Sequence, residues 1–477
     1  MRTAKSYLEG LRESDVRVWY KGERLRPLEI EKIRREASAI ADYYQHHHRD
    51  PVNVVHSKYG RHSTTLLVTD TKEALKLKAE SYYSLARNYC GIIGRPPDYI
   101  NSVVSTWAGS ADLFGPFAEN VTAFYRGMVN NDLFVTHSTS ELKGGPKSGI
   151  RVVAEKENGV VISGARAMAT AAPICDEILI APTRVQDDEI DKAIVCAIPA
   201  DAEGLELICR YNFDGPSNVS GYFDESDAVV VLKDVFVPWE KVFIYRDLKA
   251  YNTVVKNTGT SPACSLQTNA RAIAKLETIM ELLQRWTEIH PKYQAGNFTQ
   301  TAGKALRDLQ ILKALQNQAL EQCDKIQSCW QPSVPVIEAA KMFFMESYPK
   351  IVSSLRIDMG ADMFSLFTRD EIDPATALEL CDQWGISADA FGKRQEVVML
   401  LFDMLVSTFG VRHELYEQYF AGSPQRAISN YWLSNSGREM HRNIGDSLER
   451  VNRIYMENFT RPSFSNRDLE FSEALAQ

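Results

Sequence analysis

The spacing of hydrophobic residues divides the chain into a helical part, a β part and a second helical part. Before residue 135, hydrophobic residues recur at every third or fourth position, as in the series that begins Leu75, Ala79, Tyr82. This period marks one buried face of a helix. Residues 28–47 have the same spacing. We therefore expect residues 1–135 to form an N-terminal helical domain.

A different pattern begins near residue 134. Short runs rich in β-branched residues are bounded there by Gly, Pro, Asp or Asn, which is typical of strands. Residues 151–165 predict two strands joined at Asn158-Gly159, a strong two-residue hairpin turn. Further strands are predicted at 178–181, 193–198, 205–209, 228–232 and 235–237. Strands without intervening helices predict a central antiparallel β domain, 136–262, folded as a small barrel or sandwich.

The helical period returns near Cys264 and continues to the end of the chain. Long segments with this period are 265–289, 301–329, 335–357, 390–410 and 425–455. Helices of this length in one domain normally form a bundle. We therefore expect residues 263–477 to form a C-terminal helical bundle, which would also carry the contacts between subunits.

Composition narrows the class of protein. The chain has 477 residues, of which 44% are hydrophobic and 24% charged, so a large core can form without disulfides. Its eight cysteines are scattered and include no CxxC pair, which indicates free thiols in a reducing compartment and predicts a cytoplasmic protein. A net charge of −8 without a strongly basic stretch argues against a nucleic-acid surface. No apolar run is long enough to span a membrane.

Three consecutive histidines, His46 to His48, are a poor metal site. Adjacent residues on a helix point in different directions, so the three rings cannot converge on one ion. We therefore predict no metal centre.

The octapeptide GRPPDYIN, residues 94–101, carries the most distinctive local chemistry. Pro96 and Pro97 are excluded from a helix interior but suit its first turn, and Asp98 would favour the positive end of the helix dipole. Arg95 and Tyr99 would then stand at the start of a helix and point into one cavity. For the octapeptide alone, a proline turn with a surface arginine and a half-buried tyrosine is the favoured explanation.

Four blocks in the same order narrow the interpretation. They are GRPPDY at 94–99, SGARAMAT at 163–170, FDESDAVVVLKDVFVPWEKVFIYRD at 223–247 and FGVRHELYEQYFAGS at 409–423. Together they resemble the 4-hydroxyphenylacetate 3-hydroxylase family, the oxygenase component of two-component flavin monooxygenases. The resemblance covers nearly the whole chain and implies an α+β fold of the acyl-CoA dehydrogenase-like type.

The resemblance also implies a reaction. A separate NAD(P)H:flavin reductase would supply FADH2, which reacts with O2 to give a flavin C4a-hydroperoxide. One oxygen atom would then be inserted ortho to the hydroxyl of a small phenolic substrate. The fold implies a homotetramer, or at least a dimer, in which a neighbouring subunit completes the FAD site.

Three residues fall on the catalytic positions of the family, namely Arg95, Tyr99 and His137. Arg95 would balance negative charge on the flavin. His137 would accept the phenol proton or hold it in a hydrogen bond, and Tyr99 would bind the same hydroxyl. His137 could instead be an ordinary histidine at a strand edge.

The cofactor-binding set predicted from the resemblance consists of Arg95, His137, Ser138, Thr139, Ser140, Thr170 and Ser423. Thr170 falls where the family places a hydroxyl near flavin N5, although an ordinary strand threonine is the alternative. Ser423 is assigned to a flavin phosphate, although a loop residue that ends a helix is the alternative. Arg412 and His413 lie in a matching block and are interpreted as structural.

Other functions remain open at this point. Residues 210–222 are shorter than the loop that covers substrate in the family, so a chlorinated or nitrated phenol, or a carrier-bound tyrosine derivative, are alternative substrates. A 4-hydroxybutyryl-CoA dehydratase-like enzyme would need cysteines that are absent near Cys90 and His290. A non-enzymatic scaffold on the same fold would not need Arg95, Tyr99 and His137 together.

Overall fold

The computed structural model describes residues 1–140, 148–186, 188–211, 220–289, 296–364, 372–435 and 438–458. The chain forms two compact units, Met1–Ala421 and Gly422–Gln477. The first unit contains the central sheet and most of the helices, so the division at residues 135 and 262 stays a prediction.

Helices dominate the N-terminal region, as expected, but short strands interrupt them. The helices are α1 (Ala4–Glu13), α2 (Glu31–His47), α3 (Lys72–Asn88), α4 (Pro97–Ala108) and α5 (Ala118–Asn131). Two unpredicted strands, β1 (Val18–Tyr20) and β2 (Glu23–Leu25), join the central sheet. Another unpredicted pair, β3 (Val54–Ser57) and β4 (Gly60–Ser63), forms a separate hairpin. Strands of three or four residues are too short to show a period of two.

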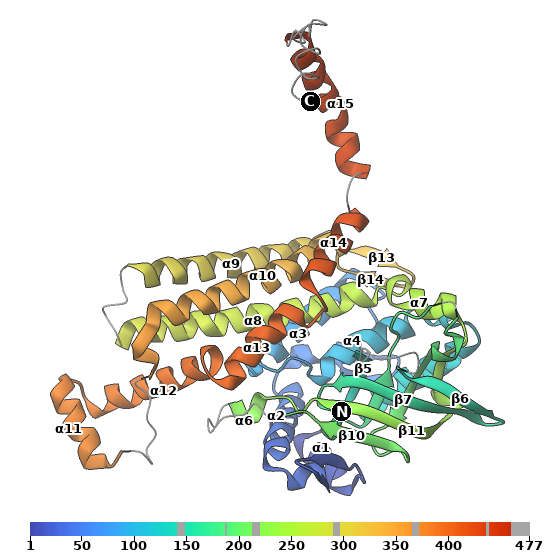
Figure 1. Ribbon diagram of the computed structural model, residues 1–477, viewed down its shortest axis with the longest axis horizontal. Helices are drawn as coiled ribbons and strands as arrows, with labels where there is room; N and C mark the ends of the chain where they lie inside the picture. Colours follow the sequence, from blue (N-terminus) through green and yellow to red (C-terminus); the bar gives the residue numbers. More distant parts are fainter. Residues whose placement is uncertain are drawn as a thin grey trace, which may run out of the picture. The chain divides into compact units, whose positions relative to one another are not determined.

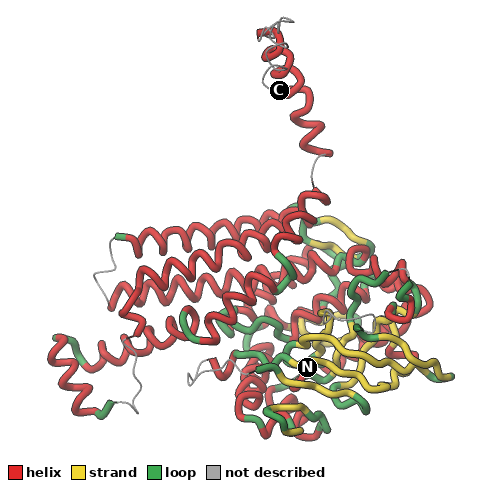
Figure 2. Tube along the Cα trace, viewed as in Figure 1, coloured by secondary structure: helices red, strands yellow, loops and turns green. Residues whose placement is uncertain are grey.

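The central sheet has ten strands among the described residues, in the order β12-β9-β8-β5-β7-β11-β10-β1-β2, with β6 paired to β7 (Figures 1 and 2). Its remaining strands are β5 (Val135–Ser140), β6 (Arg151–Lys156), β7 (Gly159–Ala169), β8 (Glu177–Ile180), β9 (Ile194–Pro199), β10 (Leu205–Cys209), β11 (Ala228–Pro238) and β12 (Val242–Tyr245). Pairing is mostly antiparallel, as predicted, but β1–β10 and β5–β8 are parallel.

Strand positions agree closely with the hydrophobic pattern, with three differences. The β6–β7 hairpin is present, but Lys156 pairs with Gly159, so the turn lies at Glu157-Asn158, one residue earlier than predicted. The two runs 228–232 and 235–237 form one strand, β11, with a register shift between Leu232 and Val235. The bulge contains the residues between the two predicted runs, which the hydrophobic pattern had separated into two strands. Strand β12 was not predicted.

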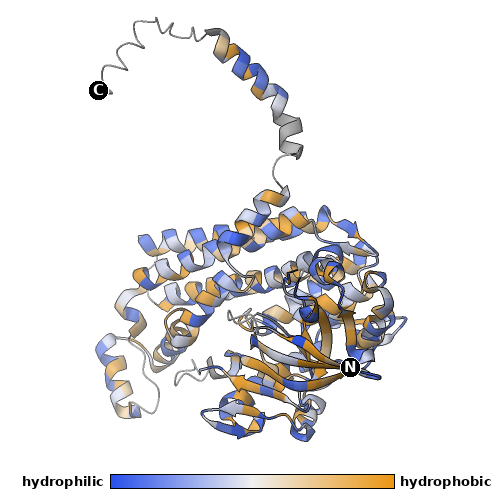
Figure 3. Ribbon diagram, turned by 45° about the vertical axis from the view of Figure 1, so that its right-hand side comes forward, coloured by the Kyte–Doolittle hydropathy of each residue, from blue (hydrophilic) through white to orange (hydrophobic). Residues whose placement is uncertain are grey.

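Strand β8, in the middle of the sheet, is buried on both faces. In β8, Ile178 and Ile180 pack into one core, whereas Leu179 and the following Ala181 pack into another. Such a strand shows a continuous hydrophobic run instead of an alternating pattern. Figure 3 shows the strands coloured mainly as hydrophobic.

Long helices complete the first unit. They are preceded by the short α6 (Ser220–Phe223) and comprise α7 (Leu248–Asn257), α8 (Thr260–Ile289), α9 (Asn297–Glu321), α10 (Val334–Met359), α11 (Pro374–Trp384), α12 (Ala388–Leu405) and α13 (Thr408–Tyr419). Helices α8, α9 and α10 run side by side and share one hydrophobic core (Figure 1). The second unit contains α14 (Pro424–Asn435) and α15 (Arg438–Asn458). None of the helices in the described ranges is long and apolar enough to cross a membrane.

Two predicted helices were too long. Segment 301–329 ends as a helix at Glu321 and continues into a hairpin of β13 (Asp324–Ile326) and β14 (Cys329–Gln331). Trp330 in this hairpin exchanges hydrogen bonds with Thr69, 261 residues away, and such a tertiary contact leaves no local period. Segment 390–410 is broken at Ser407, whose hydroxyl accepts a hydrogen bond from the Gly410 N–H and so begins α13.

A buried lysine in the N-terminal helices is expected to make the stability of the protein depend on pH. Lys78 is 4% exposed and donates to the Leu67 carbonyl at 2.9 Å and to Ser105 Oγ at 2.5 Å, without an ion pair to a described carboxylate. Burial lowers its pKa to about 7. The unfolded chain therefore binds more protons between pH 7 and 10, and this group makes stability rise with pH by about 2 kcal/mol from pH 7 to 9.

Lys78→Met should remove that rise. The expected result is a smaller difference between the free energies of unfolding at pH 7 and pH 9, measured by chemical denaturation. Lys76→Met, an exposed position on the same helix, is the matched control and should keep the rise. An unchanged pH dependence in Lys78→Met would contradict the assignment.

Candidate active site

Arg95 stands immediately before a helix, as the two prolines predicted. Pro96 is the N-cap of α4, and Pro97 and Asp98 occupy its first turn. The Asp98 carboxylate accepts a hydrogen bond from Gln267 on α8 at 2.9 Å. Because α4 is tied to α8 in this way, the chain before it is held in a fixed direction.

The guanidinium of Arg95 is buried and only partly satisfied. Nη1 donates to Tyr416 Oη at 2.5 Å and to the Gly94 carbonyl at 3.3 Å, and Nη2 donates to the Phe420 carbonyl at 2.9 Å. A guanidinium has five N–H groups. Nε–H and one N–H of Nη2 therefore have no hydrogen-bond partner among the described residues and remain for a ligand.

Tyr99 and His137 lie beside this cation. The Arg95 Cζ atom is 4.0 Å from the centre of the Tyr99 ring, within the range of a cation–π contact. The rings of Tyr99 and His137 are 5.3 Å apart between centroids. The three residues predicted as catalytic come from α4, the turn before it and strand β5, and they form one cluster.

The environment of His137 keeps it neutral. Its Nδ1 atom is buried without a hydrogen-bond partner in the described part of the chain. Burial, and to a lesser extent the charge of Arg95, lower the pKa of His137 to about 3. A neutral imidazole can accept a hydrogen bond, but it is a weak base, so it can hold a hydroxyl better than it can remove its proton.

Two adjoining cavities meet at this cluster. The first has a volume of about 300 Å³ and the second about 400 Å³. Arg95, His137, Thr139 and Phe420 line both of them. Side chains that line only the first include Tyr99, Ile100, Val103, Trp107, Cys264 and Lys341. The first cavity is therefore mainly apolar and aromatic, which suits a small aromatic ring.

Only some of the residues predicted to contact the flavin through a hydroxyl group line a cavity. Thr139, Ser140 and Thr170 line the second cavity. Ser138 is fully buried and lines neither cavity, whereas Ser140, two residues further along β5, lines the second. Ser423 belongs to the second unit, where its hydroxyl contacts Gln425 and the Arg426 N–H at the start of α14.

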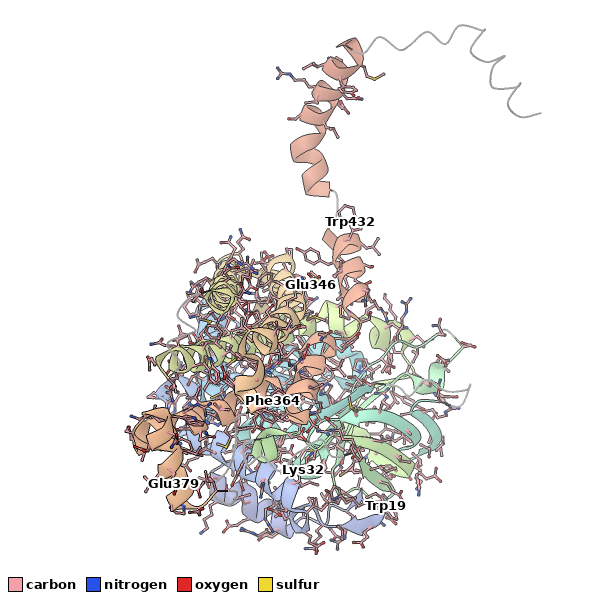
Figure 4. All side chains as sticks on the ribbon, turned by 60° about the vertical axis from the view of Figure 1, so that its left-hand side comes forward. Trp19, Lys32, Glu346, Phe364, Glu379 and Trp432 are labelled. Carbon is pink, nitrogen blue, oxygen red and sulfur yellow. The ribbon has the colours of Figure 1, made fainter. Side chains whose placement is uncertain are left out.

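A cluster of buried charges borders the second cavity. The Asp224 carboxylate forms ion pairs with Lys32 at 2.8 Å, with Arg210 at 2.6 Å and with Arg412 at 2.7 Å. Burial raises the pKa of Asp224, but these three cations outweigh it and hold the pKa below its ordinary value. Lys32, labelled in Figure 4, belongs to α2, so the cluster joins α2, the segment before β11 and α13.

The sequence analysis missed the residues that hold Arg95. Glu225 and Tyr416 both contact it, and Arg412, interpreted as structural, lines the second cavity. The acidic run DESD at 224–227 was a usable signal, because acidic residues beside a predicted strand need cationic partners when buried. Within the described ranges, no three His, Cys, Asp or Glu side chains are grouped so that they could hold a metal ion.

Residues 210–222 stand where the family has its substrate-covering loop and are shorter than that loop. Arg210 lines the second cavity, but residues 212–219 lie outside the described part of the chain. The same is true of residues 141–147, which follow the predicted flavin contacts, and of His290.

Comparison with known proteins supports the resemblance. The 4-hydroxyphenylacetate 3-hydroxylase N-terminal family matches residues 3–244, and the C-terminal family of the same name matches residues 251–440. The chain is 31% identical over 450 residues to the oxygenase component of 4-hydroxyphenylacetate 3-monooxygenase from Thermus thermophilus, with 89% of this chain and 92% of that protein covered.

A second sequence relative and a solved structure are also similar to this chain. The oxygenase component of 4-nitrophenol 2-monooxygenase from Rhodococcus is 26% identical, over 88% of this chain and 86% of that protein. A crystal structure of the oxygenase component of 4-hydroxyphenylacetate 3-monooxygenase with FAD and 4-hydroxyphenylacetate is 28% identical. It has a TM-score of 0.88 and covers 95% of this chain and 100% of that one. With both family halves matched in order, this chain belongs to the 4-hydroxyphenylacetate 3-hydroxylase family.

Proposed function

We propose that this chain is the oxygenase component of a two-component FADH2-dependent hydroxylase of small phenols. In the overall reaction, FADH2, O2 and a phenol give FAD, a catechol and water, so one oxygen atom enters the ring ortho to the hydroxyl. The observation that carries the proposal is the cluster of Arg95, Tyr99 and His137 at the junction of two cavities.

The residues at the junction suit a flavin ring. Arg95 keeps two N–H donors without partners in the described chain, and His137 Nδ1 is likewise unpaired. Thr139, Ser140 and Thr170 add hydroxyl groups along the second cavity. A flavin ring carries carbonyl oxygens and ring nitrogens that need such partners. When bound in reduced form, the flavin supplies the oxygen chemistry.

The protein's own residues bind and orient the reactants. Arg95 remains protonated, so it would stabilise negative charge on the cofactor. Neutral His137 would accept a hydrogen bond from the phenol hydroxyl. Tyr99 lines the first cavity and would bind the same hydroxyl from the other side. Aromatic walls in this cavity would exclude water from the reacting carbon.

Partners follow from the same proposal. FADH2 would come from a separate NAD(P)H:flavin reductase, and the enzyme would act as a homotetramer or dimer. Support for an assembly comes from α15, where Leu448, Val451, Ile454 and Tyr455 are spaced along one face and are each at least 50% exposed. A helix rarely leaves such a face uncovered. The cytoplasmic location stays a prediction, consistent with eight free cysteines.

A phenol panel would test the function. The chain, FAD, NADH and a flavin reductase are mixed under ¹⁸O2 with 4-hydroxyphenylacetate, 4-nitrophenol or tyrosine. The expected result is a catechol that carries one ¹⁸O atom from at least one of these phenols. Complete conversion of oxygen to hydrogen peroxide with every phenol would argue against the proposal. The product pattern would also decide between the alternative substrates.

A further inference from the structure

The hydroxyl group that orients Arg95 at the junction of the cavities belongs to a residue near the C-terminal end of the first unit. Tyr416, on α13, places its hydroxyl oxygen 2.5 Å from Arg95 Nη1, across 321 residues of sequence. The Arg95 Cζ atom also lies 5.5 Å from the centre of the Tyr416 ring. Tyr416 therefore contacts the guanidinium with both its hydroxyl and its ring.

A second contact fixes the main chain of the same residue. Glu225 is 2% exposed, and its Oε1 atom accepts a hydrogen bond from the Arg95 backbone N–H at 2.6 Å. Gly94 makes room for both partners. A Cβ atom on Gly94 would lie 2.7 Å from Tyr416 Oη and 2.8 Å from Glu225 Oε2, which is too close for any side chain.

Tyr416 is itself contacted by a second arginine. Arg271 lies 5.4 Å from the centre of its ring and forms a two-point ion pair with Glu417, the next residue on α13. Lys275 also pairs with Glu417, and all three residues are buried. Burial raises the pKa of Glu417, but the charges of Arg271 and Lys275 outweigh it and lower that pKa to about 2. This ion pair anchors α13 to α8 and so fixes the position of the Tyr416 hydroxyl.

We propose that Tyr416 and Glu225 are positioning residues, which hold Arg95 in the orientation that presents its free N–H groups to the flavin. This inference rests on the proposed function. It requires that Tyr416 act through Arg95, whose guanidinium donates to the Tyr416 hydroxyl. Because that hydroxyl keeps its own O–H donor and Tyr416 also lines the second cavity, coupling between the two residues is the property that decides the inference. Without the Tyr416 hydroxyl the guanidinium loses one of the acceptors that order it, and without Glu225 the Arg95 main chain loses its acceptor. The cost of ordering these groups on binding would then weaken ligand affinity.

A double-mutant cycle on flavin binding tests the inference without turnover. The affinities for oxidised FAD and, under anaerobic conditions, for reduced FAD are measured for the wild type, Tyr416→Phe, Arg95→Ala and the double variant. Tyr416→Phe removes only the hydroxyl and should weaken binding of reduced FAD about tenfold, as expected for loss of a hydrogen bond to a charged group. In the Arg95→Ala background, the same change should have no further effect.

Tyr83→Phe is the matched control. Tyr83 lies on α3, donates its hydroxyl to Glu277 at 2.6 Å and lines neither of the two cavities, so this change also removes one tyrosine hydroxyl and its hydrogen bond. This variant should bind reduced FAD like the wild type. Glu225→Gln keeps an acceptor for the Arg95 N–H and should retain most of the affinity, whereas Glu225→Ala should not. Thermal unfolding of each variant identifies any general loss of structure.

The outcomes separate this inference from the proposed function. If the wild type binds FAD and the effects of the Tyr416 and Arg95 changes simply add, Tyr416 acts independently and the inference is wrong. An equal loss of affinity in Tyr83→Phe would also overturn it. If the wild type binds neither form of FAD, the proposed function fails and this inference fails with it.

Discussion

Arg95→Ala is expected to lower the rate of phenol hydroxylation by about 10²–10³-fold, the usual cost of removing one donor aimed at developing charge. The physical reason is that Arg95 is the cation at the junction of both cavities, and two of its N–H groups have no partner in the described chain. A small side chain there leaves the flavin without a donor and lets water enter. The measurement is the initial rate of catechol formation with saturating reduced FAD.

The matched variant for this test is Arg95→Lys. It retains a positive charge but cannot donate to Tyr416 and the Phe420 carbonyl at once, because an ammonium lacks the planar fork of arginine. We expect an intermediate rate, below the wild type and above Arg95→Ala. Full activity in Arg95→Ala would remove Arg95 from the catalytic set.

The general plan of the fold was predictable because long helices and buried strands leave periods in the sequence. Segment 265–289 became α8, Thr260–Ile289, and segment 335–357 became α10, Val334–Met359. The features that were missed have short local signals. The three-residue strands β1 and β2 show no period, and the hairpin at 324–331 depends on the contact between Trp330 and Thr69.

The candidate site was predictable only in part, for the same reason. Arg95 and Tyr99 are four residues apart at the start of a helix, so local structure alone brings them together. His137 entered through the family resemblance, and strand β5 carries it to the same place. Glu225 and Tyr416 could not be found by spacing, because they reach Arg95 across 130 and 321 residues. Contacts of that range depend on tertiary packing, in which α8 contacts both α4 and α13 through Gln267 and Arg271.

The alternation of β5 also limits what a run of residues can predict. Ser138, Thr139 and Ser140 were assigned to the flavin because they directly follow His137. In a strand, adjacent side chains face opposite sides, so Ser138 and Ser140 share the face opposite His137 and Thr139. Ser140 nevertheless lines the second cavity, whereas Ser138 lines neither. A contact between Ser138 and a ligand therefore stays a prediction without support from the cavity, whereas Thr139 lines both cavities.

His137→Ala is expected to separate oxygen consumption from hydroxylation. Reduced flavin should still react with oxygen, because Arg95 is intact, but the phenol would lose the acceptor for its hydroxyl hydrogen. We expect the yield of catechol to fall about 10²-fold, near the lower end of the effect of a positioned acid–base group. The oxygen that is consumed without hydroxylation of the phenol should appear as hydrogen peroxide. The measurement is the ratio of catechol to hydrogen peroxide, with His56→Ala, an exposed histidine on β3, as control.

The pH dependence gives a second check on His137, and its sign follows from its environment. Burial and the charge of Arg95 lower the pKa of His137 to about 3, so the side chain stays neutral as pH falls from 8 to 5. An ordinary histidine, with a pKa of about 6.5, would gain a proton in that interval and lose its capacity to accept a hydrogen bond. The ratio of catechol to hydrogen peroxide in the wild type should therefore stay constant from pH 8 to 5. A fall in that ratio with a midpoint near 6.5, absent in His137→Ala, would show that His137 titrates as an exposed imidazole and would contradict the proposed site.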